Sequence, residues 1–474
     1  MDAQGILLIC IFVPIVGAFF LPAVGKVSVF MRNILALIFV GVSFASALLL
    51  LPQVLTGDEF LFYLKLPLGM SIGFLGDALA VFMALTSSLL GAFIVFYSFG
   101  YIKHYQNQNE YYMMVVLFIG AMMGLVFSTN LIFIYLFWEI SAICCWRLIA
   151  FFRKKEIVIR ANKAFLITVA GSLVMLLGFI AIYAETGTFD LLALHGLLLP
   201  NFIVLFIMFG ILTKSATFPF HSWLPDAGVA PSPVTSLLHA AVLVKIGVYM
   251  FARLFLVNFE IEIIWSEIIP ILAAVSALVS AGAALIENDL KRIIAYSTVS
   301  QLSFILLGLS CGSALGAAGA MLYILMHGLA KGGLFLCAGV VEQATHTKDI
   351  RELGGLIHNM PKTALSFAIC AFSVMGLPPL GGFFAKYMVI GGAVVADQPW
   401  IAFVFVVGAI MTIAYLARVF VKVFFGPVKY PTLKETSIPM IFSVVSLAVL
   451  SIVAGIFVKI PAELVDVIMI SMGW

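Results

Sequence analysis

Four lysines lie inside long apolar stretches, where a membrane would penalise them: Lys214, Lys245, Lys331 and Lys386. A lysine at the centre of a membrane helix costs about 2.5–3.5 kcal/mol, so four of them indicate partners or a function. His327 lies four residues before Lys331 and therefore on the same helix face. Amines and imidazoles can accept and release protons, so this set favours ion movement over covalent chemistry. The alternative is that each cation pairs locally and holds helices together.

One carboxylate and two further polar residues extend this set. Glu139, in LIFIYLFWEISAICCW, is the sole acid within the surrounding spans, and we expect it to pair with Lys214. Forming or breaking that pair would change the proton affinity of Lys245. Asp77 opens an apolar stretch and fits either an ionisable site or the start of a helix. His239 fits either a connection to a nearby proline-rich break or a hydrogen bond at a helix end.

The proline-rich stretch FPFHSWLPDAGVAPSP contains His221 and Asp226, whose types suggest catalysis or metal binding. Their spacing matches no metal motif, and no activated nucleophile lies beside them. We interpret the stretch as a structural break, with a role for His221 in ion access. The chain has no phosphate-binding loop, no dinucleotide fingerprint and no C-x-x-C spacing. We therefore expect this chain to bind no metal and no cofactor.

The elements that must hold these residues are membrane helices. Of the 474 residues, 64% are hydrophobic and 10% are charged, whereas soluble domains are near half apolar and about a quarter charged. Long apolar runs without two-residue alternation favour α-helices over a closed barrel. We predict an all-α polytopic membrane protein with about fourteen spans. They lie near residues 4–24, 30–52, 72–98, 112–128, 131–151, 162–184, 202–216, 236–254, 265–286, 293–310, 316–341, 364–396, 401–425 and 438–459.

Two of the predicted spans are interrupted. The seventh runs into the proline-rich stretch, and the twelfth contains MGLPPLGGFFAK. Broken helices at membrane depth are tolerated only inside protein or along a wet cavity. The breaks lie five spans apart and each lies beside a lysine, which predicts two inverted five-helix repeats. The predicted units are N-terminal helices in 1–110, a first repeat in 111–258, a second repeat in 259–430, and a C-terminal helix with its tail in 431–474.

The basic residues predict the orientation. Most of them lie in the odd-numbered loops, whereas the even-numbered loops hold only Lys65 and Arg253. By the positive-inside rule, the odd-numbered loops are cytoplasmic and both termini lie outside a prokaryotic plasma membrane. The first span lacks a basic n-region and a clear cleavage site, so we expect it to remain as a helix. The positive charges form no patch with interleaved aromatic residues, which excludes a nucleic-acid partner.

Five stretches resemble one family of membrane subunits. This antiporter-like family includes large membrane-arm subunits of respiratory complex I, large subunits of Mrp cation/proton antiporters and matching subunits of membrane-bound hydrogenases. Because the chain ends soon after the last span, it is most similar to short members such as the Mrp D-type subunit. The resemblance covers roughly residues 70–400. It is carried by WE at 138–139, TKSATFPFHSWLPDAGVAPSPVTSLLHAAVLVKIGVY, ENDLKRIIAYSTVSQLSF, HGLAKGGLFLCAGVV and MGLPPLGGFFAKY.

The resemblance implies a chain of ionisable groups at mid-membrane. It also implies partners: other membrane subunits of the same family, small membrane subunits, and a peripheral hydrogenase or dehydrogenase arm. Any iron–sulfur, nickel–iron or flavin group would belong to those partners. The implied positions are the span-5 glutamate Glu139, the broken-helix lysine Lys214, the span-8 lysine Lys245, the span-11 relay of His327 and Lys331, and Lys386 at the second break.

We therefore predict a proton- or sodium-translocating subunit of a redox-driven complex, such as a membrane-bound hydrogenase or a complex I-like dehydrogenase. Protons would enter at the broken seventh span beside Lys214 and Glu139, pass the span-11 relay, and leave near Lys386. The main alternative is the D-type subunit of an Mrp-like sodium/proton antiporter with no redox partner. Further alternatives are a scaffold with an idle relay and a quinone-binding subunit.

Overall fold

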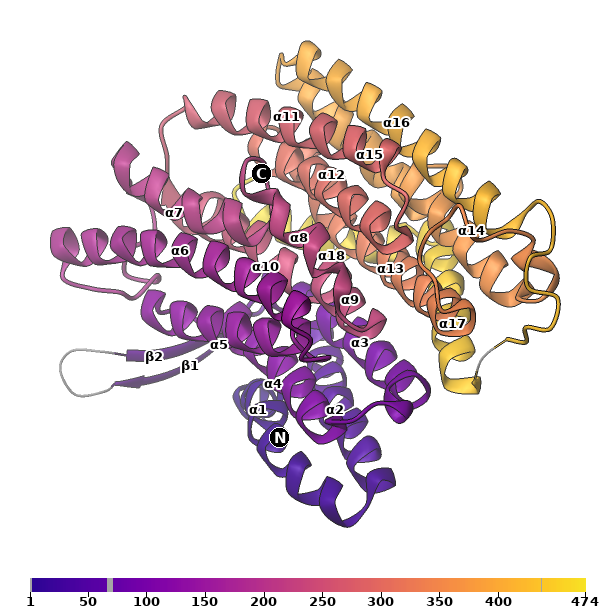
Figure 1. Ribbon diagram of the computed structural model, residues 1–474. Coiled ribbons are helices and arrows are strands. Elements are labelled where there is room, and N and C mark those ends of the chain that lie inside the picture. Colours follow the sequence, from indigo (N-terminus) through magenta and orange to yellow (C-terminus); the bar gives the residue numbers. More distant parts are fainter. Residues whose placement is uncertain (1, 66–70, 436) are drawn as a thin grey trace.

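The computed structural model describes residues 2–65, 71–435 and 437–474, and this part of the protein is almost entirely helical (Figure 1). Twelve helical segments of the described part are long and apolar enough to cross a membrane. They are α1 (Ala3–Val27), α2 (Val29–Leu55), α3 (Ala78–Tyr101), α4 (Gln108–Phe127), α5 (Leu131–Ile149), α6 (Lys155–Thr186), the composite segment Ser232–Asn258, α11 (Trp265–Ile286), α12 (Leu290–Ser310), α13 (Ala314–Thr345), α16 (Pro399–Phe424) and α17 (Ile438–Ile456).

Shorter apolar helices lie at the two interruptions that the sequence predicts. α7 (Asn201–Lys214) ends at the first, and the chain continues through the short turns η3 (Phe220–Ser222), α8 (Trp223–Asp226) and η4 (Ala227–Val229). At the second, α14 (Pro361–Met375) ends on Gly376, whose φ of 84° suits a left-handed helix cap. α15 (Gly381–Val395) then begins. Both interruptions are confirmed, whereas the count of about fourteen spans stays a prediction.

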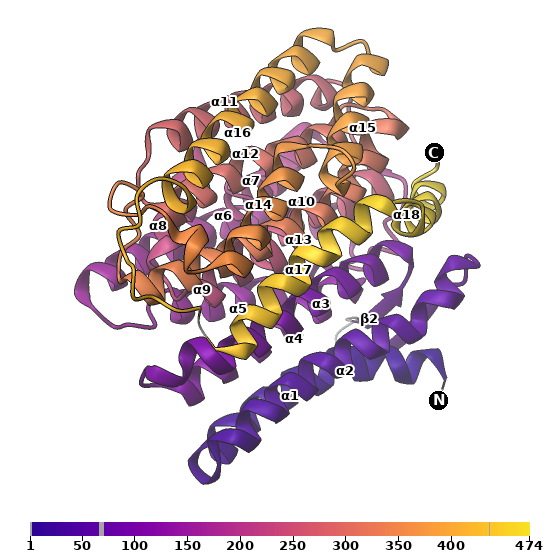
Figure 2. The ribbon, with the colours of Figure 1, turned by 90° about the vertical axis from the view of Figure 1, so that its right-hand side faces the viewer.

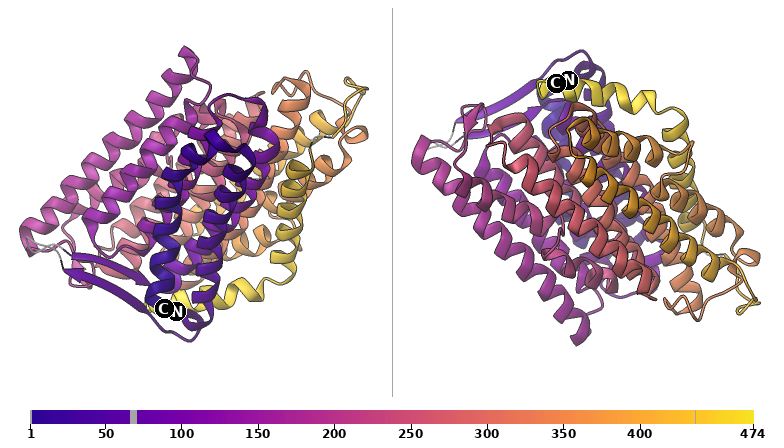
Figure 3. Two further views of the ribbon diagram at one scale, coloured as in Figure 1. Left: turned by 90° about the horizontal axis from the view of Figure 1, so that it is seen from below. Right: turned by 90° about the horizontal axis from the view of Figure 1, so that it is seen from above.

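The centre of the bundle is formed by α12 and α13. In the most apolar 18-residue stretch of each helix, 94% of the residues are buried. α13 packs against α12, α14, α15 and α17. The α1–α2 hairpin and α16 lie on opposite sides of the bundle (Figures 2 and 3). Their surfaces carry apolar side chains such as Phe30 and Trp400, which are 73% and 80% exposed. A protein with this many apolar, outward-facing helices is a multi-pass membrane protein.

Both termini lie at the same end of the helices (Figures 2 and 3). α18 (Lys459–Ser471), a further helix, follows α17 and leads to the C-terminus at this end. This placement agrees with the prediction that both termini lie on one side of the membrane. The assignment of that side to the outside stays a prediction from the basic residues.

A hydrogen-bonding pattern recurs in the two proposed repeat units. At the start of α5, Leu131 N donates to Phe189 O at 3.0 Å, and at the start of α12, Leu290 N donates to Lys348 O at 2.8 Å. Isolated bridges join Asn130 to Asp190 and Asp289 to Asp349. Each residue of the second set lies the same number of positions after its counterpart in the first set. The pattern agrees with the predicted repeats, and their inverted relation stays a prediction.

A β-hairpin replaces the start of the predicted third span. β1 (Phe60–Lys65) pairs antiparallel with β2 (Ser71–Gly76). The predicted span from residue 72 therefore began too early. The residues of β2 are mostly apolar, so the sequence does not distinguish them from the start of a membrane helix. Two residue pairs form a second, parallel pairing between β3 (Leu197–Leu198) and β4 (Phe259–Glu260).

The composite segment Ser232–Asn258 is less regular than the sequence predicts. It contains α9 (Ser232–Ser236), the π-helical η5 (Leu237–Ala241), α10 (Leu243–Phe251) and the π-helical η6 (Ala252–Asn258). Arg253 lies in η6, and only 4% of it is exposed, so its assignment to a loop was wrong. It is retained in the interior by an ion pair to Asp77 at 2.5 Å. π-Helical turns are frequent at functional sites.

Candidate functional site

The predicted cations come together in the interior of the bundle. Lys214, Lys245, His327 and Lys331 have no exposed surface, and Lys386 is 4% exposed. They lie on α7, α10, α13 and α15. Among the described residues, none of these five side chains has a carboxylate within 4.0 Å. The alternative that each cation forms its own local ion pair is therefore not what the structure contains.

Lys214 is the last residue of α7, where the partial negative charge of a helix end favours a cation. Its Nζ donates to Trp138 O at 3.2 Å and to Ser141 Oγ at 3.0 Å. The same nitrogen lies 5.0 Å from the centroid of the Trp138 ring, which is a cation–π distance. α5 thus holds the ammonium group through neutral groups.

Glu139 does not form the expected ion pair with Lys214. Its Oε1 accepts a hydrogen bond of 2.5 Å from Ser172 Oγ on α6. Consecutive helical side chains point about 100° apart, so Glu139 turns toward α6 while the Trp138 ring faces Lys214. Glu139 still acts electrostatically on Lys214. The two residues therefore interact electrostatically at a distance and do not form an ion pair.

Lys245 on α10 extends to α13, where its amine lies beside Gly328, the residue that follows His327. Lys245 Nζ is buried without a hydrogen-bond partner among the described residues, and so are both ring nitrogens of His327. A Cβ on Gly328 would overlap Lys245 Nζ, so the absence of a side chain there lets the amine reach α13. Buried polar groups normally have partners, protein or water. These nitrogens therefore define a place where water or a transferred proton belongs.

Lys331 and Lys386 continue the set. Lys331 Nζ donates to Ile294 O on α12 at 3.1 Å. Lys386 Nζ donates to Val374 O at the end of α14 at 2.7 Å. Lys386 follows its break, whereas Lys214 precedes its own, so the two lysines do not occupy matching positions.

His327 is the centre of this constellation. The titratable groups that act on it electrostatically are Lys245, Lys331, His239 and Lys386. We call these five residues the buried row. His239 lies in η5, and both of its nitrogens also lack a partner within the described part. The alternative of a simple helix-end hydrogen bond for His239 is not observed.

The other accessory candidates lie outside the buried row. Asp77 is the N-cap of α3 and accepts a hydrogen bond from Ala80 N at 2.8 Å, so it is a helix-start residue that also neutralises Arg253. His221 lies in η3 at the first break, half-buried beside the Phe218 ring at 5.5 Å. Asp226 forms ion pairs with Lys163 at 2.7 Å and Arg292 at 2.8 Å. It therefore ties α6 and α12 to the break.

The Asp226 ion pairs predict an acid-sensitive contribution to stability. Partial burial raises the pKa of the Asp226 carboxyl, but hydrogen bonds from Lys163 and Arg292 outweigh burial and leave that pKa below its ordinary value. The stabilisation is thus complete above about pH 4 and is lost as the pH falls through the lowered pKa. Asp226→Asn should cost about 1–2 kcal/mol at pH 7, and thermal unfolding should show that difference disappearing in acid. The exposed Glu185→Gln is the control, and an equal effect of both changes would contradict the assignment.

Besides the Arg253–Asp77 pair, the sequence analysis missed the ion pair of Lys291 with Glu342. Lys291 Nζ lies 2.9 Å from Glu342 Oε2, and the Lys291 side chain is only 2% exposed. The predicted spans began at residue 293 and ended at residue 341, which left both residues in loops. One signal was present, because Glu342 lies eleven residues after Lys331 and hence on nearly the same face of α13.

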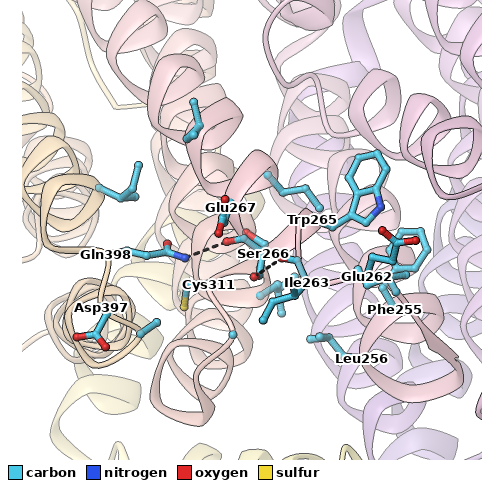
Figure 4. A pocket seen from close by; sticks show the side chains of 18 of the residues that line it. Phe255, Leu256, Glu262, Ile263, Trp265, Ser266, Glu267, Cys311, Asp397 and Gln398 are labelled. Atoms are coloured by element: carbon cyan, nitrogen blue, oxygen red, sulfur yellow. Dashed lines mark hydrogen bonds between the residues drawn. The ribbon is translucent and has the colours of Figure 1, made fainter. Parts of the chain in front are cut away.

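The structure also contains a pocket of about 880 Å³ at the end of α12 opposite to Lys291. Figure 4 shows Gln398 donating to Ser266 O, at 2.9 Å, at its centre. Glu262, Glu267 and Asp397 also line it. It contains no member of the buried row. No group of three or more potential metal ligands occurs in residues 2–65, 71–435 and 437–474.

Sequence comparison connects this arrangement to known proteins. A family model described as "NADH:quinone oxidoreductase/Mrp antiporter, TM" matches residues 128–412. A second, described as the N-terminus of chain 5 of NADH-ubiquinone oxidoreductase (complex I), matches residues 66–112. The A-type subunit of a Na(+)/H(+) antiporter from Alkalihalophilus pseudofirmus is 36% identical in an alignment of 440 residues, and the match covers 83% of this chain and 54% of that protein. The A1-type subunit from Staphylococcus haemolyticus is 36% identical in an alignment of 428 residues, and the match covers 82% of this chain and 53% of that protein.

The chain thus spans about half the length of the curated relatives it matches. Solved structures share its fold over 99% of the chain. A chain of the Mrp complex from Dietzia has a TM-score of 0.92 at 22% identity, with 97% of that chain covered. A chain of the membrane-bound sulfane sulfur reductase, an archaeal respiratory complex, has 0.90 at 24% with 98% covered. A chain of respiratory complex I from Thermus thermophilus has 0.86 at 25% with 99% covered. The chain therefore belongs to the family of transmembrane subunits shared by NADH:quinone oxidoreductases and Mrp antiporters.

Proposed function

We propose that this chain is the proton-translocating membrane subunit of a multisubunit complex, and that the buried row carries the protons. The observation that supports it best is the set of buried nitrogens on His239, Lys245 and His327 that lack partners within the described part. A buried ammonium or imidazole without a partner is costly. A role in passing protons along a hydrated line of such groups would explain why the protein retains them despite this cost.

We further propose that a cation gradient drives or opposes this movement, with sodium as the counter-ion. The relatives that are 34–36% identical are named Na(+)/H(+) antiporter subunits, which supports this choice. The D-type position in such a complex, expected from the sequence, remains part of the proposal. Partners would then be other membrane subunits of the family and small membrane subunits.

The redox-driven reading is the second candidate. It is favoured by the fold shared with the sulfane sulfur reductase and with respiratory complex I. In that case a peripheral arm would carry the redox groups, and this chain would bind none of them. Purification of the intact complex distinguishes the candidates, because iron–sulfur or flavin absorbance in the purified complex would support the redox-driven candidate over the cation-driven one.

Lys386→Ala tests the proposed function. Lys386 is the last lysine of the row, and its loss should reduce proton movement to the background of vesicles without the complex. Assembly should persist, because the change removes a buried cation rather than leaving one unpaired. Acidification of vesicles carrying the complex, followed with a pH-sensitive dye, measures the effect, and the exposed Lys103→Ala is the control. Unchanged transport in Lys386→Ala would contradict the role of the row.

A further inference from the structure

We propose that Glu342 and Lys291 form a proton-uptake site that joins one aqueous face of the protein to the buried row through the hydroxyl groups of α9 and His239. The proposal rests on the proton-translocating function proposed above. It differs from the uptake beside Lys214 and Glu139 that the sequence predicts, because its ion pair lies in the second predicted repeat unit and was not recognised by the sequence analysis.

The ion pair spans the boundary between surface and interior. The Glu342 side chain is 25% exposed, whereas that of Lys291 is 2% exposed, so the carboxylate meets water and the amine lies behind it. Lys291 Nζ also donates to Ala230 O at 2.8 Å. Glu342 Oε2 accepts a hydrogen bond of 3.0 Å from Ser232 Oγ, and Tyr101 Oη lies 3.5 Å away. The site therefore has an amine that can release a proton, a carboxylate that can take one up, and an outlet to solvent.

α13 aligns this pair with the row. Glu342 lies eleven residues, or about three turns, after Lys331, and His327 lies one turn further along the same face. The rise of a helix places Glu342 about 16 Å from Lys331 along the axis. The distance is too long for direct proton transfer, so intermediate groups are needed.

α9 and η5 supply those groups. Ser232, Ser236 and His239 follow at intervals of four and three residues, which places them on one helix face. α9 packs against α13 (Figure 1). Ser236 Oγ donates to Gly332 O at 3.4 Å, and the His239 ring lies 4.5 Å from that of Phe335, one turn from Lys331. These contacts place Ser232 beside the ion pair, and Ser236 and His239 within about one turn of Lys331 along α13.

His239 is the connecting group. Lys331 and Lys291 are the charged groups that act on it electrostatically. Both of its nitrogens lack a partner in the described part of the chain. It can therefore accept a proton on one nitrogen and release one from the other.

The proton movement needs no further reactant. A proton from water adds to the Glu342 carboxylate, and the neutral carboxyl no longer holds the Lys291 ammonium. The ammonium gives its proton inward past the Ser232 and Ser236 hydroxyls to His239, and water carries it across the gaps where no hydrogen bond joins these groups. The neutral amine then takes the proton from Glu342, which restores the ion pair with one proton transferred inward.

Other pairs at this end of the bundle have a different arrangement. Arg292 pairs with Glu287 at 2.8 Å and Lys348 with Asp289 at 3.0 Å, and all four side chains are 23% to 30% exposed. Neither pair places a buried amine behind its carboxylate. Glu287 thus provides a matched control, because it is an ion-paired carboxylate at the same end that does not face the row.

Glu342→Gln in the intact complex is the main test. Proton transport into vesicles should fall at least about tenfold, while the amount of assembled complex and its thermal midpoint stay near those of the unchanged protein. Glu342→Asp should recover a large part of the rate, since it restores a titrating group, whereas Glu287→Gln should transport normally. A purely structural role for Glu342 would instead leave proton transport per assembled complex near normal, and that result would overturn the proposal.

The failure of this proposal is distinguishable from failure of the proposed function. Normal transport in Glu342→Gln with loss of transport in Lys386→Ala would overturn the uptake site and leave the row intact. Normal transport in both would overturn both. Should Glu342→Gln fail to assemble because it leaves Lys291 unpaired, Lys291→Gln/Glu342→Gln replaces it in the assay. The double variant should assemble and transport poorly, and normal transport by it would overturn the uptake site.

Discussion

Replacing Lys331 by methionine is expected to abolish proton translocation while the complex still assembles. Lys331 is fully buried, and its only hydrogen bond within the described part of the chain is to the backbone oxygen of Ile294. Methionine has a similar length and no charge, and exchanging a buried cation for an apolar group is often neutral or stabilising. The loss of one titrating group should nevertheless interrupt the row beside His327. Dye-detected proton movement in vesicles, with assembly measured on native gels, gives the two readouts.

Lys331→Arg separates titration from charge. Arginine keeps a permanent positive charge and does not release its proton in proteins. We therefore expect this variant to be as inactive as Lys331→Met, although it retains the field that acts on His327. Substantial transport in Lys331→Arg would mean that Lys331 acts as a fixed charge rather than as a proton carrier. The exposed Lys434→Met is the surface control, and it should transport normally.

Asp77→Asn is expected to have the largest effect on stability. The Arg253 guanidinium donates to both oxygens of Asp77, at 2.5 Å and 2.8 Å, and the two side chains are 5% and 6% exposed. Breaking a buried pair by removing one partner costs about 3–5 kcal/mol, because the other charge stays buried and unpaired. Asparagine can still cap α3 at Ala80, so the loss should come from Arg253. Thermal unfolding of the purified complex measures it.

The double variant Asp77→Asn/Arg253→Gln checks that cause. Removing both charges should restore part of the lost stability, since coupled residues deviate from additivity. Equal destabilisation by the single and the double variant would mean that the charge of Arg253 is not responsible. Proton transport per assembled complex should be normal in both variants, because Asp77 and Arg253 lie outside the buried row.

Some features follow from local sequence. Long apolar runs determine helices and a membrane, because backbone groups in lipid must bond within the segment. The prolines and glycines at 217–231 and 376–382 determine the two interruptions, because they remove donors and loosen the helix. Asp77 as a helix start was also within reach, since aspartate is a preferred N-cap.

Contacts between helices did not follow from the sequence. Glu139 was expected to meet Lys214, yet it turns to Ser172. Arg253 was placed in a loop, and the ion pair of Lys291 with Glu342 was missed. The π-helical turn around His239 left no signal that periodicity could reveal.

The sequence by itself determined that ionisable side chains are buried in membrane helices, because burial in lipid depends on the apolar length of each segment. Only the tertiary structure decided which of these side chains face one another. A helix that is apolar all round has no polar stripe to indicate its rotation, and a direct contact such as Lys291 with Glu342 depends on the rotation of two helices at once. The members of the buried row were therefore visible in the chain, whereas their order and their connection to solvent were not.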